Sequence, residues 1–254
     1  MTRRRFFAPP EAFATDGSNV TLASEETRHL RDVLRLKAGD EVFVFDGAGR
    51  EYRCTVEECR RDSTTLKLCA GVAPAHRESP LGLTLAVALL KGEKFDLVVQ
   101  KATELGVARI VPVLTKHADV RLRDETDAAR RLARWRRVAL EAAKQSGRAL
   151  VPQVAAPLAL ASLLGAAWAG DAEWRVIFAE RGGRTLSAEM AALHTRPHVL
   201  TALVGSEGGW AEEELALALD AGWSAVTLGG RTLRAETAAI AVAVLLQHQF
   251  GDLV

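Results

Sequence analysis

The sequence lacks the features that mark membrane, metal-binding and disulfide-stabilised proteins. No run approaches the roughly 18 apolar residues that a membrane span needs. The three cysteines show no CxxC spacing, and the six histidines show none of the spacings typical of a metal site. The basic start of the chain leads into only a short apolar patch broken by prolines, which argues against a signal peptide. We therefore expect a cytoplasmic protein without a metal, a disulfide framework or a membrane partner.

The common nucleotide-binding fingerprints are also missing. No G-x-G-x-x-G opens the first strand–helix unit, and no G-x-x-x-x-G-K-[ST] occurs anywhere in the chain. An NAD(P)-dependent oxidoreductase on an α/β sheet is therefore a disfavoured alternative. The sequence G-S-E-G-G is not G-x-S-x-G either, so a hydrolase elbow is not supported.

The net charge of +1 conceals an uneven distribution. Residues 73–150 carry 15 basic and 9 acidic side chains, whereas residues 151–254 carry 6 and 11. Arginine supplies 26 of the 33 basic residues, and its planar guanidinium suits bidentate contacts with phosphate. A segregated basic region permits a nucleic-acid partner, although a solvated helix face would give the same pattern.

Residues 1–72 follow the pattern of a small β-rich domain. The segments 41–45 and 51–56 have strand composition on either side of a glycine-containing turn, which predicts a β-hairpin. Apolar residues within 25–35 have helical spacing, which predicts one short helix. One helix among several short strands favours a barrel, and the proline-containing residues 73–80 read as a linker.

The pattern changes in residues 81–254. The apolar run 83–90 is typical of a parallel strand buried on both faces. Phe95 begins a helical stripe that Gly106 ends, and strands and helices then alternate to the end of the chain. Such alternation predicts an α/β domain whose ligands lie beyond the carboxyl ends of the strands.

Two glycine-containing turns follow short apolar runs in the last fifth of the chain. They span 203–209 and 228–238, and each leads into a helical pattern. Glycine lets a ligand approach bare backbone, and a helix N-terminus presents unpaired N–H groups there. The turns therefore predict a ligand site, with tight structural turns as an equally simple explanation.

With these motifs placed, the chain resembles the RsmE family, SPOUT-class methyltransferases that act on N3 of a uridine in small-subunit ribosomal RNA. The resemblance covers both predicted domains and rests on five segments in the right order. These are residues 28–40, 91–94 with 100–106, 141–148 and the two C-terminal turns. Two positions depart from the family pattern, because the family usually has proline where this chain has Ser206 and often at Gly230. Both departures loosen a turn without removing a functional group.

The resemblance implies a fold and an activity. It implies a PUA-like RNA-binding barrel in residues 1–72 and a SPOUT α/β domain with a trefoil knot in residues 81–254. It implies S-adenosylmethionine as methyl donor, a homodimer, and methylation at N3 of one uridine (m3U) in 16S rRNA. The expected substrate is an assembled or nearly assembled small ribosomal subunit. A non-catalytic RNA-binding ribosome assembly factor is the alternative of another class.

Arg234 and Glu236 are the candidates for the chemistry. Methyl transfer from a sulfonium is an in-line displacement that depends on placement and on the management of charge. The attacking uracil resembles an imide anion, which a cationic Arg234 would stabilise. The Glu236 carboxylate could take or steer the N3 proton. An Arg–Glu pair that merely caps the last helix is the alternative.

The remaining candidates fall into two groups. The resemblance places the cofactor against Leu203, Val204, Gly205, Glu207, Gly208, Gly209, Leu228, Gly229, Leu233, Arg234 and Ala238. Basic residues in four segments are the predicted RNA contacts: Arg3, Arg5, Arg28, His29, Arg31, Arg35, Lys94 and Arg148. Solvated surface charge remains the alternative for the second group, and a cap on the following helix remains one for Glu207.

Overall fold

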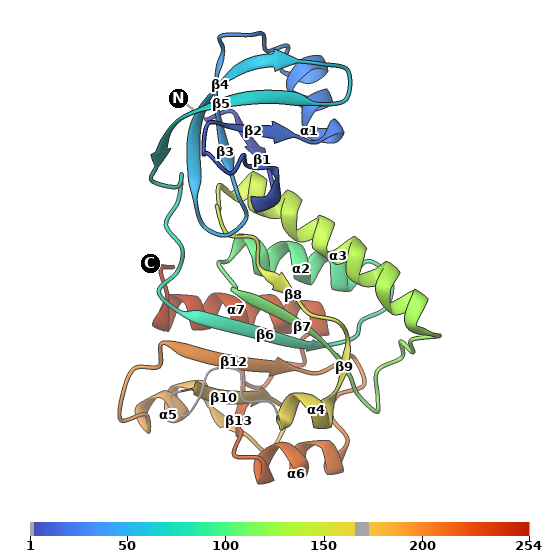
Figure 1. The fold of residues 1–254 in the computed structure, drawn as a ribbon. Coiled ribbons are helices and arrows are strands. Elements are labelled where there is room, and N and C mark those ends of the chain that lie inside the picture. Colours follow the sequence, from blue (N-terminus) through green and yellow to red (C-terminus); the bar gives the residue numbers. More distant parts are fainter. Residues whose placement is uncertain (1–2, 166–172, 254) are drawn as a thin grey trace. The chain divides into compact units, whose positions relative to one another are not determined.

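The computed structural model describes residues 3–165 and 173–253, which form two units (Figure 1). One unit comprises Met1–Glu78 together with Leu140–Val151. The other comprises Ser79–Ala139 and Pro152–Val254. We call them the N-terminal unit and the C-terminal unit. The predicted domain limits at residues 72 and 81 remain predictions, and residues 140–151 were not predicted to pack with the N-terminal strands.

The N-terminal unit is built on a five-stranded sheet in the order β1-β3-β4-β5-β2. The strands are β1 (Arg5–Phe7), β2 (Asn19–Leu22), β3 (Glu41–Phe45), β4 (Glu51–Cys59) and β5 (Thr64–Val72). All neighbours are antiparallel except β1 and β3. Alternate apolar side chains such as Val42, Val44 and Leu66 point into one core, as a sheet with one buried face requires.

The predicted hairpin of β3 and β4 forms, and its turn shows why. Gly47 and Gly49 have φ of +75° and +99°, a region that side chains disfavour. The Asp46 carboxylate accepts hydrogen bonds from the N–H groups of Ala48 and Arg50 at 2.8 and 3.0 Å. The turn is therefore stabilised by one aspartate and two glycines.

The expected single helix in residues 25–35 is two shorter ones. The α-helix α1 (Ser24–Arg28) ends at Arg28, and a π-helix (His29–Val33) follows without a break. A short 3₁₀ turn (Pro10–Ala12) is the other helical piece before β3. Sequence periodicity could not distinguish the two helix types over so few residues.

The C-terminal unit contains a parallel sheet in the order β11-β13-β10-β12-β6-β7-β8, with β9 paired to β7. The strands are β6 (Gly82–Ala88), β7 (Arg109–Leu114), β8 (Gln153–Val154), β9 (Leu158–Ala159), β10 (Glu173–Phe178), β11 (Arg184–Thr185), β12 (Val199–Val204) and β13 (Ser224–Thr227). The helices are α2 (Lys94–Glu104), α3 (Glu125–Ser146), α4 (Leu160–Leu164), α5 (Leu186–Ala191), α6 (Glu212–Asp220) and α7 (Ala235–Phe250). The last residues of α3 belong to the N-terminal unit.

Helices cover both faces of this sheet. The helices α2 and α7 pack against each other, and α4 and α6 form a second pair with the opposite face (Figure 1). The central strand β6 is accordingly buried along almost its whole length, which explains its unbroken apolar sequence. The predicted α/β alternation is confirmed, whereas the short β8, β9, β11 and α4 were not predicted.

None of the helices in the described part of the chain combines the length and apolar character that crossing a membrane requires. The trefoil knot implied by the resemblance stays a prediction.

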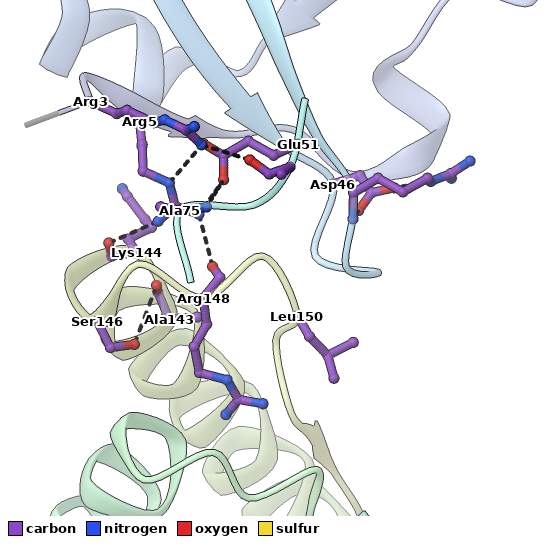
Figure 2. Close-up of polar contacts among 12 residues, drawn as sticks. Arg3, Arg5, Asp46, Glu51, Ala75, Ala143, Lys144, Ser146, Arg148 and Leu150 are labelled. Atoms are coloured by element: carbon purple, nitrogen blue, oxygen red, sulfur yellow. Dashed lines mark hydrogen bonds and ion pairs between the residues drawn. The ribbon is translucent and has the colours of Figure 1, made fainter. Parts of the chain in front are cut away.

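Glu51 is the centre of a buried ion-pair network in the N-terminal unit (Figure 2). Its carboxylate is almost fully buried and accepts hydrogen bonds from Arg3, Arg5 and the N–H of Ala75. The Arg5 guanidinium, 8% exposed, also donates to the carbonyls of Lys144 and Arg148. One arginine thus joins β1 and β4 to residues that follow almost a hundred positions later.

Replacing Glu51 by glutamine should destabilise the folded chain by about 3 kcal/mol, because the Arg5 charge stays buried without a counter-charge. Urea unfolding followed by circular dichroism measures this. Glu57→Gln is the matched control, since Glu57 lies on the same strand and is exposed. Equal unfolding midpoints for the two variants would show that the Glu51 network contributes no stability.

Candidate functional site

A pocket opens at the carboxyl ends of three adjacent strands, β13, β10 and β12. It encloses about 550 Å³ of space, counting the open solvent at its mouth. Its walls come from three turns, and the lining residues are Phe178, Ala179, Glu180, Val204, Gly205, Ser206, Gly209, Trp210, Thr227, Leu228, Gly229, Arg231, Leu233, Ala235 and Ala238. A parallel sheet brings these turns together because its carboxyl ends share one edge.

Glycine shapes the pocket wall at two positions. A Cβ on Gly205 would lie 3.2 Å from the Trp210 indole, tighter than most side-chain contacts. That indole is fixed, because its Nε1–H donates to the Phe178 carbonyl at 2.8 Å. Gly229 has a φ of +115°, which other residues rarely adopt. The pocket thus presents backbone directly to whatever occupies it.

Ser206 is an unpartnered polar group in the same wall. Its side chain is buried, and its Oγ has no hydrogen-bond partner within the described residues. A buried hydroxyl without a partner costs free energy that a polar ligand can recover. The pocket is therefore suited to a ligand that combines an apolar surface with hydrogen-bonding groups.

Seven of the predicted cofactor residues line this pocket: Val204, Gly205, Gly209, Leu228, Gly229, Leu233 and Ala238. The other four lie elsewhere. Leu203 is buried in the core, and Gly208 packs so closely on His117 that a Cβ would lie 2.8 Å from its carbonyl oxygen. Glu207 and Arg234 are outside the lining and belong to a neighbouring group of charges.

The sequence patterns did not predict the third turn, Phe178–Glu180, which begins at the last residue of β10. A signal was present, because this apolar run is also followed by glycines, Gly182 and Gly183. Gly183 lies so close to β13 that a Cβ would be 2.8 Å from the Val226 carbonyl carbon. The same strand-then-glycine pattern that marked the other two turns thus occurs three times.

A cluster of charged side chains from the start of α2, the turn after β12 and the start of α7 lies in the same unit. The Lys94 ammonium donates to Glu207 Oε1 at 2.6 Å and lies 3.7 Å from Glu236 Oε2. The Glu236 side chain is 12% exposed, and its buried Oε2 accepts no hydrogen bond within the described residues. Arg234 precedes α7, is exposed, and is close enough to Lys94 for its positive charge to oppose the rise in the Lys94 pKa.

The structure places Lys94 and Glu207 differently from their predicted roles. Lys94 was predicted to contact RNA, yet the structure brings it to Glu207 and Glu236 and holds its pKa above the usual value through the hydrogen bond with Glu207. Burial raises the pKa of Glu207, but the hydrogen bond from Lys94 and a backbone hydrogen bond outweigh it, so the pKa is lowered. Glu207 does not cap α6, whose capping box uses Glu214 instead.

The predicted RNA contacts in the N-terminal unit divide into two kinds. Arg5 has a buried side chain that holds Glu51, and Arg3 shares the Glu51 carboxylate (Figure 2). The buried Arg148 holds Glu78. Those bonds favour a structural role for all three. The others lie at the end of α1, in the π-helix that follows it and just beyond that π-helix, with exposed or half-exposed side chains: Arg28, His29, Arg31 and Arg35.

A metal centre receives no support from the described residues, because no three His, Cys, Asp or Glu side chains among them form a group that could hold an ion.

Family models match both units. The model described as an RNA methyltransferase domain matches residues 77–247, and that described as an RNA methyltransferase PUA domain matches residues 22–69. Together with the observed sheet and the structural similarities that follow, they confirm the predicted fold class.

The chain is similar along most of its length to proteins named ribosomal RNA small subunit methyltransferase E. The Synechocystis protein is 33% identical over 94% of this chain and 75% of its own length. The Bacillus subtilis protein is 29% identical over 90% of both. The solved structure of the Neisseria gonorrhoeae protein, bound to S-adenosyl methionine, is 31% identical and superposes with a TM-score of 0.86 over 100% of both chains. A Legionella pneumophila methyltransferase structure with bound SAM is 30% identical, with a TM-score of 0.87 over 100% of both chains.

Lys94→Met should raise the pKa of Glu207, because the variant loses the Lys94 hydrogen bond and leaves the backbone hydrogen bond to oppose burial. In the parent the pKa of Glu207 is below its usual 4.5, so the pair stabilises the fold above that value. This stabilisation is lost as pH falls through the lowered pKa. A ¹³C NMR titration of the glutamate carboxyls down to about pH 3 measures the shift.

Lys116→Met is the matched control, since Lys116 donates to the exposed Glu213 at 2.8 Å and lowers its pKa in the same way. The control should raise the pKa of Glu213 and leave the pKa of Glu207 unchanged. An unaltered Glu207 titration in Lys94→Met would show that the ion pair does not form in solution.

Proposed function

The chain belongs to the ribosomal RNA small subunit methyltransferase E family, and we propose that it transfers a methyl group from S-adenosylmethionine to N3 of one uridine in 16S rRNA. The observation that carries this proposal is the pocket at the ends of β10, β12 and β13, with the charged cluster in the same unit. The substrate would be an assembled or nearly assembled small ribosomal subunit.

The pocket suits the proposed cofactor in three respects. Its apolar wall, including Leu228, Leu233 and the Trp210 indole, can cover a flat heterocycle. Backbone at Gly205 and Gly229 is open to a ligand, and the Ser206 hydroxyl still lacks a partner. When bound, S-adenosylmethionine supplies an activated methyl group on its sulfonium.

Arg234 would stabilise the uracil in its anionic form. The guanidinium is exposed and makes no side-chain hydrogen bond within the described residues, so its donors remain available to the carbonyl oxygens of the base. It stands next to α7, whose first residues, Ala235 and Ala238, line the pocket. A group at this position can therefore face both the pocket and an incoming base.

Glu236 would accept or direct the N3 proton. One of its oxygens is buried and has no hydrogen-bond donor among the described residues, and the Lys94 ammonium lies 3.7 Å from it. A uracil N3–H is a donor of the kind this oxygen lacks. Lys94 and Glu207 would then hold the carboxylate in place, which explains why a lysine predicted to contact RNA lies here.

A homodimer is part of the proposal. The helices α2 and α7 leave apolar side chains exposed at Leu97, Val244 and Leu245, which a second copy would cover. We place the enzyme in the cytoplasm, where its substrate is made.

Mass spectrometry of 16S rRNA from cells lacking the protein tests the activity. One N3-methyluridine should disappear and return on expression of the parent, but not of Arg234→Ala. Retention of that nucleoside in the deletion strain would favour the alternative, a non-catalytic assembly factor.

Gly205→Val and Gly229→Val should abolish S-adenosylmethionine binding. The first pushes a branched side chain against Trp210, and the second forces a β-branched residue into a φ of +115° at the pocket wall. Isothermal titration calorimetry measures the affinity. Gly222→Val is the control, because Gly222 also has a positive φ and open space but lies outside the pocket lining. Unchanged affinity in both pocket variants, with the fold intact, would refute this placement.

Arg234→Ala and Glu236→Gln should each lower single-turnover methylation by on the order of 100-fold, for different reasons. The methylation rate of Glu236→Gln should rise partly toward that of the parent at higher pH, because solvent then removes the proton. The rate of Arg234→Ala should stay low, since anion stabilisation is missing at every pH. Arg234→Lys should recover little of the rate, because lysine lacks the planar fork of donors.

The measurement is a pH–rate profile with RNA and cofactor saturating. Glu212→Gln serves as control, since it changes an exposed glutamate on α6. A Glu236→Gln profile parallel to that of the parent would remove the proton-transfer role and leave Glu236 as a structural residue.

A further inference from the structure

The segment that follows α1 in the N-terminal unit has an unusual backbone. The π-helix His29–Val33 continues α1, and the Leu34 N–H donates to the His29 carbonyl at 3.0 Å. The Leu36 N–H then donates to the Leu30 carbonyl at 3.1 Å. Such wide turns are rare and occur frequently at functional sites. We call residues Arg28–Arg35 the tip.

Arg35 is held in a strained conformation. Its φ is +54°, and every other residue with positive φ in the described part of the chain is glycine. An arginine in this region costs free energy that glycine would avoid. Strained residues of this kind cluster at functional sites. The core does not need an arginine there, since Leu30 and Leu36, on either side, are the buried residues.

Between those two buried leucines the tip turns apolar side chains outward. Val33 is 65% exposed and Leu34 38% exposed, and Val33 is the most exposed large apolar side chain among the described residues. Val33 thus leaves most of its surface, and Leu34 more than a third of its surface, without contacts to the rest of the unit. These neighbouring exposed apolar residues indicate a contact surface.

The charges around the tip specify the kind of partner. Arg28 and Arg35 are exposed and make no side-chain hydrogen bond or ion pair within the described residues. Arg31 is already engaged, since it donates to Asp32 at 2.6 Å and to the Arg61 carbonyl at 2.8 Å. Two cations beside two exposed apolar side chains complement a polyanion that also offers flat apolar surfaces. Single-stranded or unpaired RNA has both properties.

Building on the proposed function, we propose that Val33 and Leu34 pack against an unpaired base of the RNA substrate, while Arg28 and Arg35 contact its phosphates. The tip would thereby recognise a nucleotide in a loop or bulge of the RNA. A base in a continuous helix would not expose its face to these side chains. The strained Arg35 would direct one cation to the backbone beside the contacted base.

Binding of the full-length protein to unmethylated small ribosomal subunits and to protein-free 16S rRNA tests this surface. The double variant Val33→Ser/Leu34→Ser should weaken binding to both by about tenfold and leave the salt dependence unchanged, because it removes no charge. Arg28→Ala/Arg35→Ala should weaken binding and reduce the salt slope by about two ions. Affinity for S-adenosylmethionine should be unchanged in both.

Leu217→Ser/Leu219→Ser is the matched control, since these leucines of α6 are 53% and 48% exposed in the other unit. If the tip pair and this control bind RNA as the parent does, the tip proposal fails while the proposed function stands. A loss confined to the assembled subunit would also overturn it, because the partner would then be a ribosomal protein. A parent that binds neither probe would overturn the RNA substrate and the tip together.

Arg35→Gly separates function from structure at the strained position. Relief of the left-handed strain should raise the melting temperature by a few degrees, while loss of the cation should weaken RNA binding several-fold. A merely structural Arg35 would instead give lower stability with unchanged binding, which contradicts the proposal.

Discussion

The parallel pairing of β13, β10 and β12 is the constraint on which the proposed active site depends. Residues more than fifty positions apart, such as Phe178 and Leu233, line one pocket only because these strands are neighbours and run the same way. From their order in the sequence, the turns after β12 and β13 would be expected to lie next to each other. The structure inserts β10 between them, so its turn becomes the middle of the pocket wall.

The same constraint shows how much of the site could be predicted. Apolar runs that end in glycine predicted two turns correctly, because those signals are local. The contribution of Phe178–Glu180 depends on strand order, which no local pattern contains. Likewise, Lys94 lies beside Glu236 because β6 and β13 end on the same edge of the sheet. The residues next to Lys94 in the sequence do not contain this information, so the sequence showed only that a basic residue was present.

Predictions of the fold differ in success for a related reason. Long elements such as α7 repeat their pattern often enough to be recognised, whereas β8, β9 and β11 have two residues each. Packing of residues 140–151 in the N-terminal unit depends on buried polar bonds around Glu51 and Glu78. Such bonds use the residue types that usually lie on surfaces, so composition does not predict them.

Arginines illustrate the limit most directly. Arg5 and Arg28 are equal in a charge count, yet Arg5 is held by a buried carboxylate and two carbonyls, and Arg28 makes no polar bond within the described residues. Burying a charge is tolerable only with partners, so a buried arginine is already committed to the fold. Arg35, an exposed arginine at the strained turn, makes no side-chain hydrogen bond or ion pair within the described residues. Its available donors, together with exposed Val33 and Leu34, make a partner the simplest reason for the strained conformation.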